Sequence, residues 1–240
     1  MDRIGRPRQA LAISLAGTAG FVDAVGFVSG GGYFVSFMSG NTTRLGVDLA
    51  HDARLAAVPA ALIASFVAGV TAGQMLGARA GHRRKTAVLL LVAALLAAAG
   101  GLGMAGAGRP PLMLTMLMLP TLMLPTLMLV ALAMGAMNMT FQREGQAALG
   151  LTYMTGALVK TGQAIGAALG GQRQTGWAGY AALWAALAGG AILGARAYAA
   201  FGPAVLLGAA GWAALMALAA LRLPPAEAGP QGRPDGLPKA

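Results

Sequence analysis

Residues able to bind a solute or carry a proton lie in apolar surroundings in this sequence. Asp23 stands about fifteen residues into the first apolar run, where an unpaired carboxylate costs roughly 2.5–3.5 kcal/mol. A partner cation or a bound proton is therefore expected, and Arg44 and Lys160 are the natural candidates. Such a cluster would bind an anion or relay a proton. The alternatives are a buried ion pair that only fixes packing, or an Asp23 that reaches water.

Two short segments supply the other polar groups. In each, a hydroxyl residue, Ser39 or Thr155, precedes a glycine and a helix-compatible run, so each hydroxyl is expected to cap a half-helix whose free N–H groups favour anions. The alternative is that Ser-Gly and Thr-Gly only break the chain for tight packing. The predicted substrate-binding residues are the polar groups of these regions: Asp23, Ser39, Asn41, Thr42, Arg44, Asn138, Thr155 and Lys160.

The same sequence pattern occurs twice along the chain. Three matches fall near one diagonal, with offsets of 115, 116 and 117 residues: Gly20–Asp23 with Gly135–Asn138, Phe37–Gly46 with Tyr153–Gly162, and Leu76–Ala80 with the identical Leu193–Ala197. A shared diagonal indicates an internal duplication. It places Asn138 opposite Asp23 and Lys160 opposite Arg44.

The composition predicts a membrane protein. The chain of 240 residues is 57% hydrophobic and 10% charged, with a mean hydropathy of +0.68 and no cysteine, whereas soluble surfaces are roughly a quarter or more charged. Crossing about 30 Å of hydrocarbon takes about 20 residues. Six apolar runs have that length, three in each half: 9–28, 56–78, 86–106, 112–139, 177–195 and 202–221. The first run continues without a polar mature start, which favours a retained helix over a cleaved signal peptide.

Charge distribution predicts the orientation. With six crossings and a cytoplasmic N-terminus, 13 cations lie inside and four outside, as the positive-inside rule requires. Each half then crosses three times, so the halves form inverted repeats, which are characteristic of secondary transporters. Segments 33–49 and 151–169 are too polar to face lipid and are predicted to be re-entrant. If they also spanned, the cations at 79–85 would move outside.

The expected fold is therefore all-α: one integral membrane domain over residues 1–222, with repeats at about 9–106 and 112–222 and a disordered tail at 223–240. Small residues every fourth position, at Gly69, Gly73 and Gly77 and at Gly162, Gly166 and Gly170, predict close helix packing. Pro120 and Pro125 are expected to kink or interrupt the fourth apolar run, unless hydroxyls or neighbours compensate.

Several functions are excluded by what the sequence lacks. It has no paired intramembrane carboxylates, no His or Cys cluster, and no nucleophile, phosphate-binding or dinucleotide motif, so neither an enzyme nor a cofactor or metal is expected. The cations flank apolar runs and do not form a nucleic-acid face. The expected partners are the lipid bilayer and a small solute, and an oligomer is left open.

Specific residues also resemble a known family. Gly20–Ala24 with Phe27, Phe37–Thr42, Gly135 with Asn138, and Thr152–Gly156 with Leu158–Lys160 are similar to the YoaK-type family of bacterial integral membrane proteins, a domain of unknown function (1275). The resemblance covers residues 10–222 and implies a six-helix protein of the bacterial inner membrane, without a substrate. The function expected from the repeats is a secondary transporter or permease for a small solute, anionic or proton-coupled. The alternative is a membrane scaffold or sensor.

Overall fold

The computed structural model describes residues 6–107, 112–143, 146–147, 154–172 and 177–222. The predicted tail at 223–240 lies outside these residues. The described chain is all-α apart from a two-residue antiparallel ladder, in which Gln142 pairs with Ala147 and Arg143 with Gln146.

The described residues form eight α-helices, three short 3₁₀ turns and two short strands in this order: α1 (Arg6–Ser29), α2 (Met38–His51), α3 (Ala57–Ala80), η1 (Gly81–Arg83), α4 (Arg84–Ala107), α5 (Leu112–Met137), η2 (Asn138–Thr140), β1 (Gln142–Arg143), β2 (Gln146–Ala147), α6 (Met154–Leu169), α7 (Trp177–Phe201), η3 (Gly202–Ala204) and α8 (Val205–Leu221). We call α1–α4 the N-terminal half and α5–α8 the C-terminal half.

Four stretches of the described chain are long and apolar enough to cross a membrane: Arg6–Ser29, Ala57–Gly106, Leu122–Thr140 and Trp177–Leu221. The second and fourth each contain two helices joined by a 3₁₀ turn, α3 with α4 and α7 with α8. The shorter α2 and α6 have 14 and 16 residues. At 1.5 Å per residue they are about 21 and 24 Å long, too short to span roughly 30 Å of hydrocarbon.

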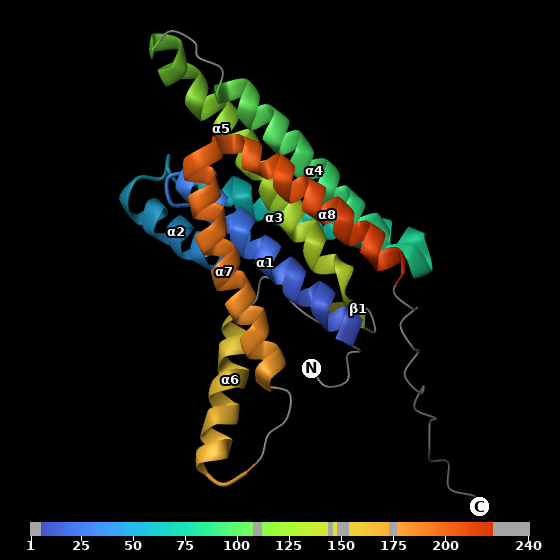
Figure 1. Ribbon diagram of the computed structural model, residues 1–240. Coiled ribbons are helices and arrows are strands. Elements are labelled where there is room, and N and C mark those ends of the chain that lie inside the picture. The colour runs from blue at the N-terminus through green and yellow to red at the C-terminus, as the bar shows by residue number, and fades with distance from the viewer. Residues whose placement is uncertain (1–5, 108–111, 144–145, 148–153, 173–176, 223–240) are drawn as a thin grey trace, which may run out of the picture.

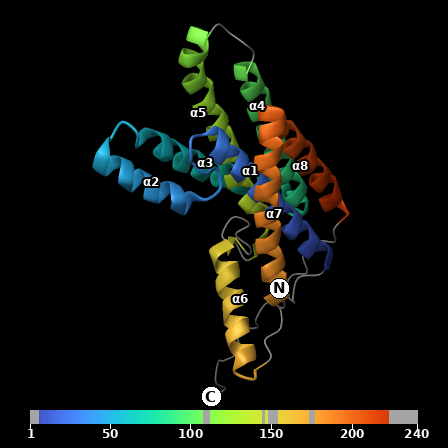
Figure 2. The same cartoon turned by 60° about the vertical axis from the view of Figure 1, so that its left-hand side comes forward.

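Long helices of one half pack against long helices of the other. The main pairs are α1 with α7, α3 with α5, α4 with α8 and α4 with α5, while α2 packs on α3 and α6 on α7. Figures 1 and 2 show α2 and α6 on separate parts of the molecule, α2 beside α3 and α6 projecting at the bottom beside the start of α7. The bundle has two ends, which we call the Ser29 end, where α1 and α4 finish, and the Arg84 end, where α4 begins.

Glycines bring α1 and α7 into direct backbone contact. A Cβ at Gly20 would overlap the Leu187 carbonyl oxygen, and a Cβ at Gly190 would overlap the Gly17 carbonyl oxygen. Further along, a Cβ at Gly194 would overlap the backbone of Phe21. Residue numbers increase together on the two helices, so α1 and α7 run parallel. Small residues permit this approach where lipid supplies no hydrophobic drive between helices.

The α3–α5 contact repeats that arrangement. A Cβ at Gly69 would overlap the Leu132 carbonyl oxygen, one at Gly135 would overlap the Phe66 carbonyl oxygen, and one at Gly73 would lie 3.0 Å from Ala136. These helices also run parallel. By contrast, Gly100 and Gly103 of α4 face Leu207 and Pro203, so α4 and α8 run antiparallel.

Two sequence expectations about packing change here. Gly69, Gly73 and Gly77 are buried and packed as predicted, but a Cβ at Gly162 or Gly166 would meet nothing within 4 Å in the described chain. The second glycine face is therefore open within the described residues, where the main packing partner of α6 is α7. The helix α5 also continues through Pro120 and Pro125. Next to Pro125, the Thr126 hydroxyl donates to the Leu122 carbonyl of its own helix at 2.7 Å, a bond from a side chain to the carbonyl four residues earlier.

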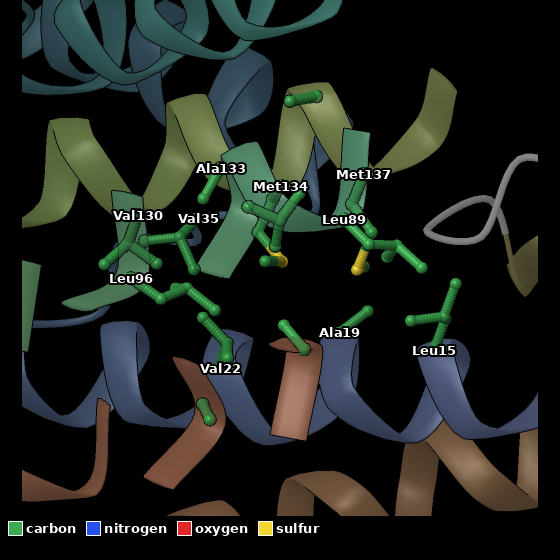
Figure 3. Packing of buried hydrophobic residues seen from close by; sticks show 14 of the residues in the cluster. Leu15, Ala19, Val22, Val35, Leu89, Leu96, Val130, Ala133, Met134 and Met137 are labelled. Carbon is green, nitrogen blue, oxygen red and sulfur yellow. The ribbon is translucent and has the colours of Figure 1, made fainter. Parts of the chain in front are cut away.

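The hydrophobic core lies where α1, α4 and α5 face one another, and buried residues of α8 extend it. Figure 3 shows Leu15, Ala19 and Val22 of α1 opposite residues of α4 and α5. All three are fully buried, as are Leu89 and Leu96. Val35, from the segment between α1 and α2, enters the same core, which ties that segment to the bundle.

Candidate functional site

Asp23 anchors the chain between α1 and α2. Its Oδ1 accepts hydrogen bonds from the backbone N–H groups of Val35 and Ser36, both at 2.8 Å. Both residues are buried, so the carboxylate satisfies donors that would otherwise be unpaired. Among the described residues no ion pair joins Asp23 to Arg44 or Lys160. The expectation of a partner cation is thus corrected, because backbone N–H groups stabilise the carboxylate instead.

Asn41 anchors the same segment from the other side. It is fully buried, its Oδ1 accepts from the Phe34 N–H at 3.0 Å and its Nδ2 donates to the Phe34 carbonyl at 2.6 Å. One amide thus replaces a pair of backbone hydrogen bonds. The ring of Phe34 lies between Phe27 and Phe37, with centroids 5.0 and 5.2 Å away. The polar motif therefore holds the turn that leads into α2.

Arg44 is paired within its own helix. Its guanidinium lies 4.0 Å from the Asp48 carboxylate and 4.9 Å from the centre of the Tyr33 ring. Asp48 is buried and also faces the Tyr33 hydroxyl at 3.4 Å. This group was missed in the sequence, although Arg44 and Asp48 stand at the i, i+4 spacing that favours an ion pair on a helix.

The two predicted half-helix caps are not formed by hydroxyls in the way expected. The helix α2 begins at Met38 with Phe37 as its N-cap and no side-chain cap. Ser39 lies in the first turn and is exposed, as is Thr42, whose hydroxyl donates to the Met38 carbonyl at 2.9 Å. Thr155 is likewise an exposed residue in the first turn of α6.

The remaining predicted residues lie elsewhere. Asn138 is buried in η2, where its Nδ2 donates to the Met134 carbonyl at 2.9 Å. Lys160 is exposed on α6. Figures 1 and 2 place α6 away from α2, so the structure joins Asp23 and Asn41 around one segment and does not bring Thr155 or Lys160 to them.

A cavity of about 230 Å³ lies near the Ser29 end, between the two halves. Its lining comes from α1 and α4 of one half and from α5, α7, η3 and α8 of the other: Val25, Ser29, Gly103, Gly106, Leu122, Met123, Thr126, Leu127, Tyr198, Pro203 and Leu206. The described lining carries no charged side chain. Its hydroxyls belong to Ser29, Thr126 and Tyr198, and those of Ser29 and Thr126 donate to carbonyls of their own helices.

At the Arg84 end, the opposite end of the bundle from this cavity, polar groups cluster around Arg84. The side chain of Arg84 lies against Gly77, where an added Cβ would come within 2.9 Å of it. Its Nε donates to the Met139 carbonyl at 3.1 Å and an NH2 group donates to Gln74 Oε1. We call Arg84, Gln74 and the Met139 carbonyl the Arg84 cluster. Thr140 follows Met139 in the chain, and its buried hydroxyl has no hydrogen-bond partner within the described part of the chain.

No group of three or more His, Cys, Asp or Glu residues capable of holding a metal occurs in the described residues. The fold and the cavity define a class: an integral membrane protein made of apolar helices whose two chain halves enclose a small cavity. The chain belongs to the family described as protein of unknown function (DUF1275), whose model matches residues 11–219. It is also 36% identical over 216 residues to a UPF0700 transmembrane protein of Rhizobium meliloti (strain 1021), covering 90% of this chain and 87% of the relative. No solved structure matches the chain.

Proposed function

We propose that this protein is a permease of the bacterial inner membrane, in which two inverted three-helix halves move a small uncharged solute through the cavity between them. The observation that carries the proposal is the cavity lined by both halves. In transporters built from inverted repeats, the solute site lies at the repeat interface. In this proposal the protein is not an enzyme. The short helices α2 and α6 enter the membrane without crossing it.

The helix contacts support inverted halves. The glycine contacts between α3 and α5 recur between α7 and α1 at fixed offsets in residue number. Adding 121 converts the α3 residues Phe66, Gly69 and Gly73 to the α7 residues Leu187, Gly190 and Gly194. Subtracting 115 converts the α5 residues Leu132, Gly135 and Ala136 to the α1 residues Gly17, Gly20 and Phe21. The parallel α1–α7 and α3–α5 pairs and the antiparallel α4–α8 pair also fit six crossings with both termini on one side. The cation distribution favours the cytoplasm for that side.

The cavity lining supports the solute class. Its volume is somewhat below the roughly 300–1,000 Å³ of drug-sized ligand sites, which suits a small molecule. Apolar walls with three hydroxyls favour an uncharged solute with one or two polar groups, because a charge would remain unpaired there. The anionic or proton-coupled solute expected from the sequence depended on Asp23, Arg44 and Lys160 meeting, and Arg44 pairs with Asp48 instead.

Osmotic swelling of proteoliposomes tests the proposal. A panel of small uncharged amides, polyols and aromatic alcohols is supplied outside, and light scattering follows solute entry. The wild-type protein is expected to accelerate entry of at least one solute. Ser29→Leu, which places a larger side chain in the cavity, should abolish that acceleration, whereas Thr43→Leu, at an exposed position of α2, should leave it unchanged. Equal rates with and without protein for the whole panel would contradict the permease and favour the scaffold or sensor.

A further inference from the structure

The internal repeat relates the Ser29 end of the bundle to the Arg84 end, but the cavity described above lies at the Ser29 end, and the Arg84 end is occupied by polar side chains. The offsets found at the helix contacts, 115 for α1 to α5 and 121 for α3 and α4 to α7 and α8, give several cavity residues a counterpart among the described residues of the Arg84 end. Val25 corresponds to Thr140, and Tyr198 and Leu206 correspond to Gly77 and Lys85. At the Ser29 end these residues border open space. At the Arg84 end, Gly77 lies against the side chain of Arg84, Thr140 follows Met139, whose carbonyl accepts from Arg84, and Lys85 follows Arg84 in the chain.

We propose that the Arg84 cluster is the closed gate at the cytoplasmic end of the solute path, and that the structure holds the protein open at the Ser29 end. This inference rests on the proposed permease function and adds the element that must move. In inverted-repeat transporters, the two halves exchange conformations so that one end opens as the other closes.

The chemistry of Arg84 suits a reversible closure. A guanidinium presents several donors in a rigid plane, and here two of them reach acceptors on different elements, Gln74 on α3 and the Met139 carbonyl in η2, the 3₁₀ turn that directly follows α5. Carbonyls at a helix C-terminus attract a cation. The side chain thus joins α3, α4 and the η2 turn that follows α5 across the end of the bundle, and Gly77 provides the flat surface on which it lies. Withdrawing one side chain would release all three contacts.

Thr140 supplies a second, independent observation. Its hydroxyl is buried, with 1% of the residue exposed, and finds no hydrogen-bond partner among the residues that the structure describes. A buried polar atom without a hydrogen bond costs free energy and requires an explanation. The counterpart of Thr140 borders the cavity at the Ser29 end, so a hydroxyl at this position would be hydrated when the Arg84 end opens. The free-energy cost of the unpaired Thr140 hydroxyl in the closed state then contributes to the equilibrium between the conformation closed at the Arg84 end and the one open there.

Cysteine labelling tests this directly because the chain contains no cysteine. Ser29→Cys and Thr140→Cys serve as single reporters, in vesicles of each orientation, with a membrane-impermeant maleimide. In the otherwise wild-type chain, the Ser29 reporter should react from the periplasmic side and the Thr140 reporter should be protected. Adding Arg84→Gln should raise the Thr140 labelling rate from the cytoplasmic side by about tenfold or more, the population shift expected for losing a charge-assisted hydrogen bond. The Ser29 reporter should become slower.

Arg83→Gln is the matched control, since it removes an equal charge one residue earlier from an exposed side chain, and it should change neither rate. Gln74→Ala, which removes only one acceptor, gives a milder opening if Arg84→Gln does not fold. Faster labelling of both reporters would mean that Arg84 holds the fold together, and this would overturn the proposal. So would a protected Thr140 reporter in both folded variants. The swelling assay distinguishes failure of the gate from failure of the permease. If the wild-type protein moves solute but the two reporters do not change in opposite directions, the gate is contradicted and the permease stands. If the reporters change in opposite directions but no solute moves, the permease is contradicted and the conformational change stands.

Discussion

Gly81 and Gly202 stand 121 positions apart and adopt the same unusual backbone conformation. Their φ angles are +54° and +58°, and each is the first residue of a three-residue 3₁₀ turn that joins two long helices, α3 to α4 and α7 to α8. A positive φ is accessible to glycine and costly for other residues. The chain therefore turns at matching points of its two halves by the same local means.

Replacing either glycine with alanine should destabilise the protein by about 1–3 kcal/mol, the usual cost of a residue in a sparsely populated backbone region. No atom of the described residues lies within 4 Å of a Cβ at either position, so the loss is expected to be conformational and similar in the two variants. Thermal unfolding in detergent measures it. A much larger loss at one position than at the other would argue against equivalent turns.

Asp23→Ala should destabilise the protein, and Asp23→Asn should not. Alanine would leave the buried N–H groups of Val35 and Ser36 without an acceptor, at a cost of about 1–3 kcal/mol, whereas the asparagine carbonyl can still accept. Limited proteolysis between residues 30 and 37 and thermal unfolding in detergent report on this. Equal destabilisation by both substitutions would show that the negative charge matters and would reopen the search for a cation.

Gly20→Ala and Gly135→Ala should each reduce the yield of folded protein in the membrane. The added methyl group would overlap a carbonyl oxygen of the partner helix, Leu187 or Phe66, and overpacking against backbone is expected to cost about 3 kcal/mol or more. Gly166→Ala is the control, since its Cβ meets no atom of the described chain. Wild-type yield and unfolding temperature for Gly20→Ala would show that α1 and α7 do not pack as described.

Reporter fusions should place the N-terminus, the 79–85 region and the C-terminus in the cytoplasm. Green fluorescent protein joined after Lys85 or after Arg222 should therefore fluoresce, and alkaline phosphatase joined after Ala107 should be active in the periplasm, because cations gather on the cytoplasmic side. An active phosphatase after Lys85 would contradict the six-crossing arrangement and, with it, the inverted halves.

The positions of the long helices were predictable because hydrocarbon thickness constrains length and composition. Each of the six apolar runs coincides with one helix, within a few residues for most of their ends. The register of the repeat was harder to predict. The identical Leu-Gly-Ala-Arg-Ala segments place Gly77 opposite Gly194, whereas the helix contacts place Gly73 there. Glycines recurring every four residues make a shift of one helical turn nearly invisible in the sequence.

The site was less predictable than the fold. The sequence marked Asp23 and Asn41 as polar residues in apolar surroundings, and both are indeed engaged in hydrogen bonds. Their partners are backbone groups of the turn at 34–36, which carry no side-chain signature. A charged side chain suggested a charged partner, although N–H groups can serve equally well. The cavity itself is built from ordinary apolar residues and depends on how six elements meet.

The pairing of α1 with α7 also has a consequence for biosynthesis. The helix α1 ends at Ser29 and its partner begins at Trp177, so nearly 150 residues must be synthesised before the two can meet. At roughly 5–20 residues per second, α1 waits on the order of ten seconds in the bilayer with its glycines exposed. During that interval the glycine surface of α1 lacks its partner helix, and a nascent chain that stalls before α7 would present it to the quality-control proteases of the membrane.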